Sequence, residues 1–119
     1  MSNEVNIFDY DKPSLVIGLG LSGYSCVKFL AEKNCPITVL DTREVPPFLD
    51  DIKANYPEIA FISSKINEEQ LESFEQIIVS PGISPRDPAL VKAQQSGKLI
   101  IGDLNLFIQE KSTAIRSGS

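Results

Sequence analysis

The clearest structural signal in this chain is the stretch Leu15-Val16-Ile17-Gly18-Leu19-Gly20-Leu21-Ser22-Gly23. Its apolar first part predicts a buried strand, and a helical pattern follows, so the glycines form a G-x-G-x-x-G turn between strand and helix. We expect Gly18 to permit the tight bend, Gly20 to let a phosphate approach the backbone, and Gly23 to let the helix pack closely. The N–H groups and dipole at the helix start favour a bound anion.

Strand and helix patterns alternate along the rest of the chain. Strands are predicted at residues 14–17, 37–40, 59–62, 76–79 and 99–101, with helices at 22–33, after Pro47, after Asn67, at 88–96 and after Asp103. Such alternation indicates a parallel sheet covered on both faces. Right-handed crossovers then predict an α/β, Rossmann-like, doubly wound five-stranded sheet in the order 3-2-1-4-5.

Several helix ends carry recognisable signals. Asn34 is suited to a left-handed stop after the first helix. Asn67, with Gln70 three residues later, resembles a capping box. Asp87 as N-cap and Pro88 at the first helical position open another helix, which Gly97 closes. Because these signals mark where helices begin and end, they also predict where the connecting loops lie.

Length and composition narrow the possible functions. The 119 residues fit one domain, predicted at residues 14–115 after a lead-in at 1–13. A net charge of -5 argues against nucleic acid and anionic membranes as partners. The chain has no histidine, and Cys26 and Cys35 have no metal-ligand spacing, so we expect no metal site and small buried thiols. No secretory signal or membrane span is recognised, which predicts a cytoplasmic domain.

Three loops of unusual composition should meet at the carboxyl ends of the strands. They are the glycine turn, Asp41-Thr42-Arg43 after the second strand, and Ser80-Pro81-Gly82 after the fourth. Ligands bind at this edge of doubly wound sheets, where the strand order reverses. Asp41 follows Gly23 by 18 residues, close to the spacing of about 20 residues for the ribose-binding acid of dinucleotide sites. The pattern fits NAD or another nucleoside diphosphate, and a turn that binds nothing stays an alternative.

Four motifs together resemble a known family. They are Gly18–Cys26, Asp41–Arg43, Ser80–Ile83 and Gly102–Phe107, and the similarity runs from about Leu15 to Ile115. They resemble the N-terminal domain of the UDP-N-acetylmuramoyl-L-alanine:D-glutamate ligases, within the Mur ligase family of peptidoglycan synthesis. That resemblance implies a UDP site in place of an NAD site. A stand-alone, regulatory NAD-binding Rossmann domain is the alternative.

The resemblance also assigns roles to residues. It implies that the glycine turn, through the backbone amides of Leu21 and Ser22, holds the diphosphate. It places the uracil and ribose among the residues of the second loop, and the nucleotide-sugar part along the third. The substrate-binding set is therefore Gly18, Gly20, Leu21, Ser22, Gly23, Asp41, Thr42, Arg43, Ser80, Pro81 and Gly82. No catalytic residue is expected among them.

The family enzyme is a three-domain ligase that uses ATP and magnesium, and its P-loop begins just after the position that matches Ile115. This chain has no P-loop there and ends in Arg116-Ser117-Gly118-Ser119, which resembles a cloning-derived tail. We therefore expect a monomeric N-terminal domain that holds the UDP end of UDP-N-acetylmuramoyl-L-alanine. The central and C-terminal domains of the same enzyme would be its partners, and alone it would be inactive.

Overall fold

The computed structural model describes residues 9–81, 83 and 86–102. Its elements are β1 (Ser14–Ile17), α1 (Leu21–Glu32), β2 (Ile37–Asp41), α2 (Leu49–Asn55), β3 (Ala60–Ser63), α3 (Glu68–Glu72), β4 (Gln76–Val79), α4 (Pro88–Gln95) and β5 (Leu99–Gly102). The predicted alternation is confirmed over this part of the chain. Gly82, the helix expected after Asp103, the tail at 116–119 and residues 1–8 of the lead-in lie outside the described residues.

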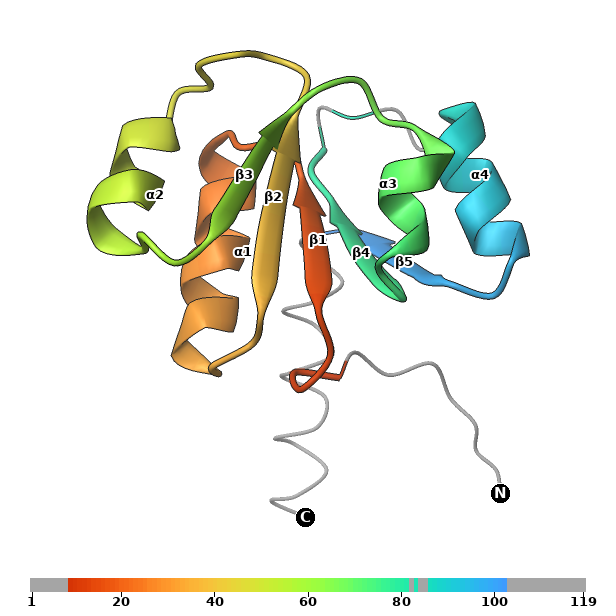
Figure 1. The fold of residues 1–119 in the computed structure, drawn as a ribbon, viewed down its shortest axis with the longest axis horizontal. Coiled ribbons are helices and arrows are strands. Elements are labelled where there is room, and N and C mark those ends of the chain that lie inside the picture. The colour runs from red at the N-terminus through yellow and green to blue at the C-terminus, as the bar shows by residue number, and fades with distance from the viewer. Residues whose placement is uncertain (1–8, 82, 84–85, 103–119) are drawn as a thin grey trace.

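The five strands form one parallel sheet in the order β3-β2-β1-β4-β5. The predicted order is therefore confirmed. In this register Ile17 pairs with Leu40 on one side and Val79 on the other, so the residues that follow these three strands emerge together. Their carboxyl ends lie at the top of the view in Figure 1, where α1 begins.

Two layers of helices cover the sheet, and each closes its own core. α1 and α2 lie on one face and α3 and α4 on the other (Figure 1). Because side chains alternate along a strand, Val16 packs toward α1 whereas Leu15 and Ile17 pack toward α3 and α4. β1 and β4 are buried along their whole length, as expected for central strands of a parallel sheet.

The helix ends agree with the sequence signals except at one place. Asn34 has a left-handed φ of 61°, and the Asp87 side chain accepts a hydrogen bond from the Ala89 amide. The Asn67 side chain likewise accepts from the Gln70 amide at 3.0 Å. The reciprocal half of the predicted capping box is wrong, because Gln70 Oε1, the atom that would accept from the Asn67 amide, is buried without a hydrogen-bond partner among the described residues. The Gln70 side-chain nitrogen donates to the hydroxyl of Ser64 in the preceding loop, so this side chain is oriented toward the loop.

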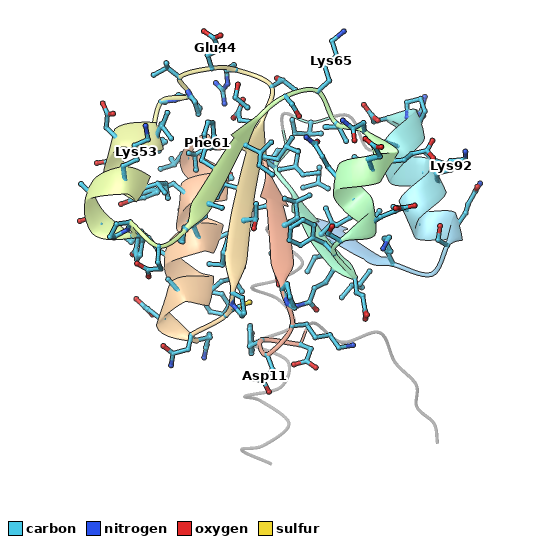
Figure 2. The ribbon with its side chains drawn as sticks, in the orientation of Figure 1. Asp11, Glu44, Lys53, Phe61, Lys65 and Lys92 are labelled. Atoms are coloured by element: carbon cyan, nitrogen blue, oxygen red, sulfur yellow. The ribbon has the colours of Figure 1, made fainter. Side chains whose placement is uncertain are left out.

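Charged side chains project from the surface (Figure 2), and hydrogen bonds hold the lead-in at the amino end of the sheet. Glu44, Lys53 and Lys92 project outward from loops and helices (Figure 2). Among the lead-in residues that the structure describes, Asp9 exchanges hydrogen bonds with the buried Gln76 side chain. In the described part of the chain, no helix combines the length and hydropathy needed to cross a membrane.

Candidate functional site

The glycine turn takes its shape from two close contacts. Gly18 has a φ of +94°, which side chains rarely allow, and its amide donates to the Leu40 carbonyl at 2.8 Å. A Cβ at Gly23 would lie 1.9 Å from the Gly18 carbonyl oxygen, so only glycine lets α1 start so close to the turn. The bending and packing roles predicted for these two glycines are confirmed.

The start of α1 is open to a ligand. Its N-cap is Gly20, no side chain caps it, and no acidic residue lies in its first turn. A Cβ at Gly20 would meet nothing within 4 Å, so the space beside this residue is empty. Helix N-terminal amides that lack a cap are strong hydrogen-bond donors and carry the positive end of the helix dipole. This combination suits an anionic group such as a diphosphate.

Asp41 lies at the end of β2 and is only 2 % exposed. Oδ2 accepts hydrogen bonds from the Leu19 amide at 2.7 Å and from Arg43 Nη2 at 2.8 Å. Oδ1 accepts from the Arg43 amide at 2.8 Å and from Arg43 Nε at 2.9 Å. Burial acts to raise the pKa of Asp41, but the hydrogen bonds from Arg43 and Leu19 outweigh it and hold the pKa below its ordinary value.

Thr42 and Arg43 directly follow β2 and form one side of the site. The Arg43 side chain is half exposed, and its flat guanidinium is held in one orientation by the two bonds to Asp41. Thr42 is exposed at the same edge. A guanidinium fixed in this way can stack on a flat ring while its remaining N–H groups stay available.

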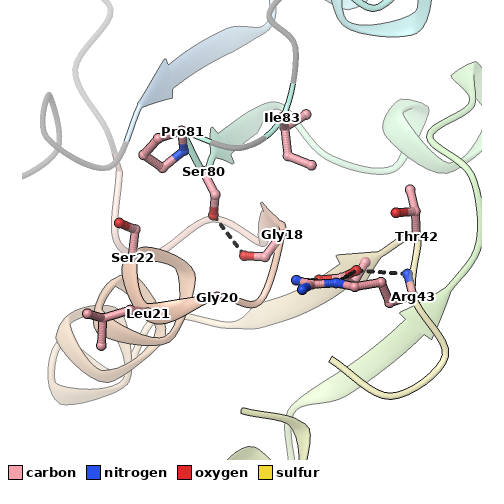
Figure 3. A pocket seen from close by; sticks show the side chains of 10 residues that line it. Gly18, Gly20, Leu21, Ser22, Thr42, Arg43, Ser80, Pro81 and Ile83 are labelled. Atoms are coloured by element: carbon pink, nitrogen blue, oxygen red, sulfur yellow. Dashed lines mark hydrogen bonds and ion pairs between the residues drawn. The ribbon is translucent and has the colours of Figure 1, made fainter. Parts of the chain in front are cut away.

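The loop after β4 closes the site from the other side. The Ser80 amide donates to the Ile17 carbonyl at 3.0 Å, and its buried hydroxyl donates to the Gly18 carbonyl at 2.8 Å (Figure 3). Pro81 is exposed beside it. Ser80 therefore joins this loop directly to the glycine turn.

These loops surround a pocket of about 410 Å³. It is lined by Gly18, Gly20, Leu21, Ser22, Asp41, Thr42, Arg43, Ser80, Pro81 and Ile83. Of the eleven residues predicted from the sequence, nine line this pocket, Gly23 packs beneath the turn, and Gly82 lies outside the described residues. Their roles toward a ligand stay a prediction.

Ile83 was missed as a site residue. It belongs to the Ser80–Ile83 motif, but an isoleucine carries no polar signal for binding. Its place in the pocket depends on how the loop turns back, with the Ile83 amide donating to the Ser80 carbonyl at 3.0 Å. Among the described residues there is no group of three or more His, Cys, Asp or Glu side chains able to hold a metal ion.

Solved structures with the same fold include two of different chemistry. One is UDP-N-acetylmuramate:L-alanyl-gamma-D-glutamyl-meso-diaminopimelate ligase from Neisseria meningitides, with a TM-score of 0.61 and 18 % identity over 78 % of this chain and 29 % of that one. Another is SirC, a precorrin-2 dehydrogenase, with a TM-score of 0.57 and 21 % identity over 82 % and 48 % of the two chains. At such identities they support the α/β fold alone.

Sequence relatives are more informative. The chain is 44 % identical over 101 residues to the UDP-N-acetylmuramoylalanine--D-glutamate ligase of Pseudomonas aeruginosa PAO1, covering 85 % of this chain and 22 % of that protein. It is 39 % identical over 102 residues to the ligase of the same name from Coxiella burnetii Dugway 5J108-111, covering 86 % and 23 %. The chain thus spans less than a quarter of the length of these curated relatives.

The family comparison covers most of the described domain. Residues 12–102 match the family described as "Mur ligase MurD-like, N-terminal domain". That range contains the glycine turn, the loop after β2 and the loop after β4, which line the pocket. On this match and on the identities above, the chain belongs to the family of MurD-like N-terminal domains of Mur ligases.

Proposed function

We propose that this domain binds the UDP end of UDP-N-acetylmuramoyl-L-alanine for an ATP-dependent ligase that adds D-glutamate in peptidoglycan synthesis. The observation that carries the proposal is the start of α1, which has no side-chain cap and faces open space at Gly20 beside a pocket of about 410 Å³. The names of the relatives supply the substrate and the reaction.

The diphosphate would lie at the glycine turn. Backbone amides at Leu21 and Ser22 are the donors, and no side chain competes for them at the helix start. The first turn also lacks an acidic residue that would repel the phosphates. A chain with a net charge of -5 must hold an anion by such local donors, because its overall field is repulsive.

The uridine would lie toward Thr42 and Arg43. Thr42 offers an exposed hydroxyl that can donate or accept, as the mixed edge of a uracil requires. Arg43 offers a flat, oriented cation against which the base can stack. The two ends of one nucleotide would thus meet two different kinds of protein group.

An NAD site is not favoured by the geometry of Asp41. In dinucleotide sites the acid at this position accepts hydrogen bonds from ribose hydroxyls. Here each oxygen of Asp41 already accepts two N–H bonds, and the carboxylate is almost fully buried. A ribose hydroxyl would have to displace one of these donors.

The chemical step would take place on other parts of the ligase. We propose that ATP and magnesium are held by the central and C-terminal domains, and that no residue of this chain touches the reacting carboxylate or the incoming amine. This domain would position the substrate in the cytoplasm as a monomer, and its contribution to cell shape and division would come through the peptidoglycan made. Its affinity alone should be lower than that of the whole enzyme.

Titration calorimetry with three ligands tests the proposal. UDP-N-acetylmuramoyl-L-alanine and UDP should both bind, whereas NADH should give no heat of binding. NADH binding without a response to UDP would favour the regulatory Rossmann alternative. No heat of binding with any of the three ligands would indicate a purely structural domain.

A further inference from the structure

One peptide group in the glycine turn is held from both sides. The carbonyl of Gly18 accepts a hydrogen bond from Ser80 Oγ at 2.8 Å, and the amide of Leu19 donates to Asp41 Oδ2 at 2.7 Å. These two groups are the two ends of the same planar peptide bond. Rotation of that plane would break both hydrogen bonds at once.

The sheet brings the two side chains to this peptide. Asp41 ends β2 and Ser80 directly follows β4, and these strands flank β1 in register. Both side chains are buried, at 2 % and 7 % exposure. The peptide that follows Gly18 therefore lies between two polar side chains that are almost fully buried.

The Gly18–Leu19 peptide needs side chains to fix its orientation. Glycine accepts positive and negative φ with similar ease, so the backbone of Gly18 does not by itself select one orientation of the peptide. The Gly18 carbonyl also lies against the start of α1, where a Cβ at Gly23 would reach within 1.9 Å of its oxygen. A rotated carbonyl would disturb the first turn of the helix, whose residues Leu21 and Ser22 line the pocket.

We propose that Asp41 and Ser80 are positioning residues, a peptide clamp on the Gly18–Leu19 bond, and that they act on the ligand through the turn without contacting it. The consequence for binding rests on the proposed function. The clamp itself is a property of the free domain, so the two can fail separately.

Ser80 and Asp41 differ in the hydrogen bonds that they make besides those to the Gly18–Leu19 peptide. The Ser80 hydroxyl donates its hydrogen bond to the Gly18 carbonyl in the turn. Asp41 also fixes the guanidinium and the amide of Arg43. Loss of Ser80 Oγ should therefore affect the diphosphate end, whereas loss of the Asp41 carboxylate should affect both the diphosphate end and the base end.

The first test uses Ser80→Ala with Ser96→Ala as a matched control. The Ser96 hydroxyl also donates to a backbone carbonyl at 2.8 Å, at the end of α4. In the free domain, hydrogen exchange of the Leu19 amide, followed by NMR, should become about tenfold faster in Ser80→Ala and stay unchanged in the control. Ser80→Thr keeps the hydroxyl and should restore slow exchange.

The affinities of the variants for UDP and uridine then distinguish a residue that positions the turn from one that contacts the ligand. In Ser80→Ala the affinity for UDP should fall about tenfold, and the affinity for uridine by clearly less. In Asp41→Asn both should fall together, with Asp87→Asn, which alters a carboxylate that caps α4, as control. A fall in UDP affinity with unchanged Leu19 exchange would mean that Ser80 touches the ligand, and would overturn the clamp.

Unchanged Leu19 exchange in Ser80→Ala together with unchanged UDP affinity would also overturn the clamp. If the wild-type domain bound no UDP, the proposed function would fail. The exchange rates in the free domain would still decide whether the clamp exists.

Discussion

At the amino end of the sheet, polar groups satisfy one another, whereas at the carboxyl end some are left open. The buried Gln76 side chain donates to the Asp9 and Lys12 carbonyls and to Ser14 Oγ, and accepts from the Asp9 amide. At the opposite end, α1 starts without a side-chain cap and faces a pocket. Closed networks of this kind stabilise the fold, and open donors bind ligands.

The same contrast runs through the glycine turn itself. A Cβ at Gly23 would collide with the Gly18 carbonyl, whereas a Cβ at Gly20 would meet nothing. One glycine therefore serves the packing of the fold and the other leaves room at the pocket. The glycine pattern in the sequence does not distinguish these two requirements, although it predicts both positions.

The largest expected effect is on Gly23. Gly23→Ala should lower the free energy of unfolding by about 3 kcal/mol or more, because the new methyl group overlaps the backbone. Urea unfolding followed by circular dichroism measures the change. Gly20→Ala is the matched control and should unfold within about 0.5 kcal/mol of wild type. Equal losses at the two glycines would remove the contrast between them.

The second largest effect is expected on UDP affinity when a side chain fills the open space beside Gly20. Gly20→Val should lower the affinity for UDP by about 100-fold, equivalent to about 2.7 kcal/mol, because its side chain would fill the open space proposed for the phosphates. Calorimetry measures the affinity, and an unchanged unfolding curve shows that the domain is intact. Wild-type affinity in this variant would mean that the phosphates lie elsewhere.

A smaller effect is expected at the amino end. Gln76→Ala leaves the hydroxyl of Ser14 and the peptide groups of Asp9 without their buried partner, and should cost about 2 kcal/mol of stability. Its UDP affinity should stay within about twofold of wild type, because Gln76 lies at the far end of β4 from the pocket. A large loss of binding would show that the two ends are coupled.

The smallest effect is on the dependence of stability on pH. The folded-state pKa of Asp41 lies below its ordinary value of 3.8, so its contribution to stability is complete above that value and is lost as pH falls through the folded-state pKa. Urea unfolding from about pH 5 downward should give a shallower decline for Asp41→Asn than for wild type. Parallel declines would show that the pKa is not lowered.

The sequence predicted the fold well because its signals are local. Strand order followed from alternation, and Asn34 and Asp87 act as their residue types suggest. The contacts it could not supply are long-range: Gln76 with the lead-in, and Asp41 with the Leu19 amide. Asp41 was predicted as a ligand contact, and nothing in its residue type signals that four N–H donors of the protein surround it.

We propose that the carboxyl end of the sheet holds the diphosphate of UDP at the glycine turn. The most direct test is an ¹H–¹⁵N NMR titration of the domain with UDP. We predict that the largest amide shifts occur at Gly20, Leu21 and Ser22, with smaller shifts at Thr42 and Arg43 and none around Gln76. Shifts that centre on residues outside the pocket, or no shifts at all, would mean that UDP does not bind at the glycine turn.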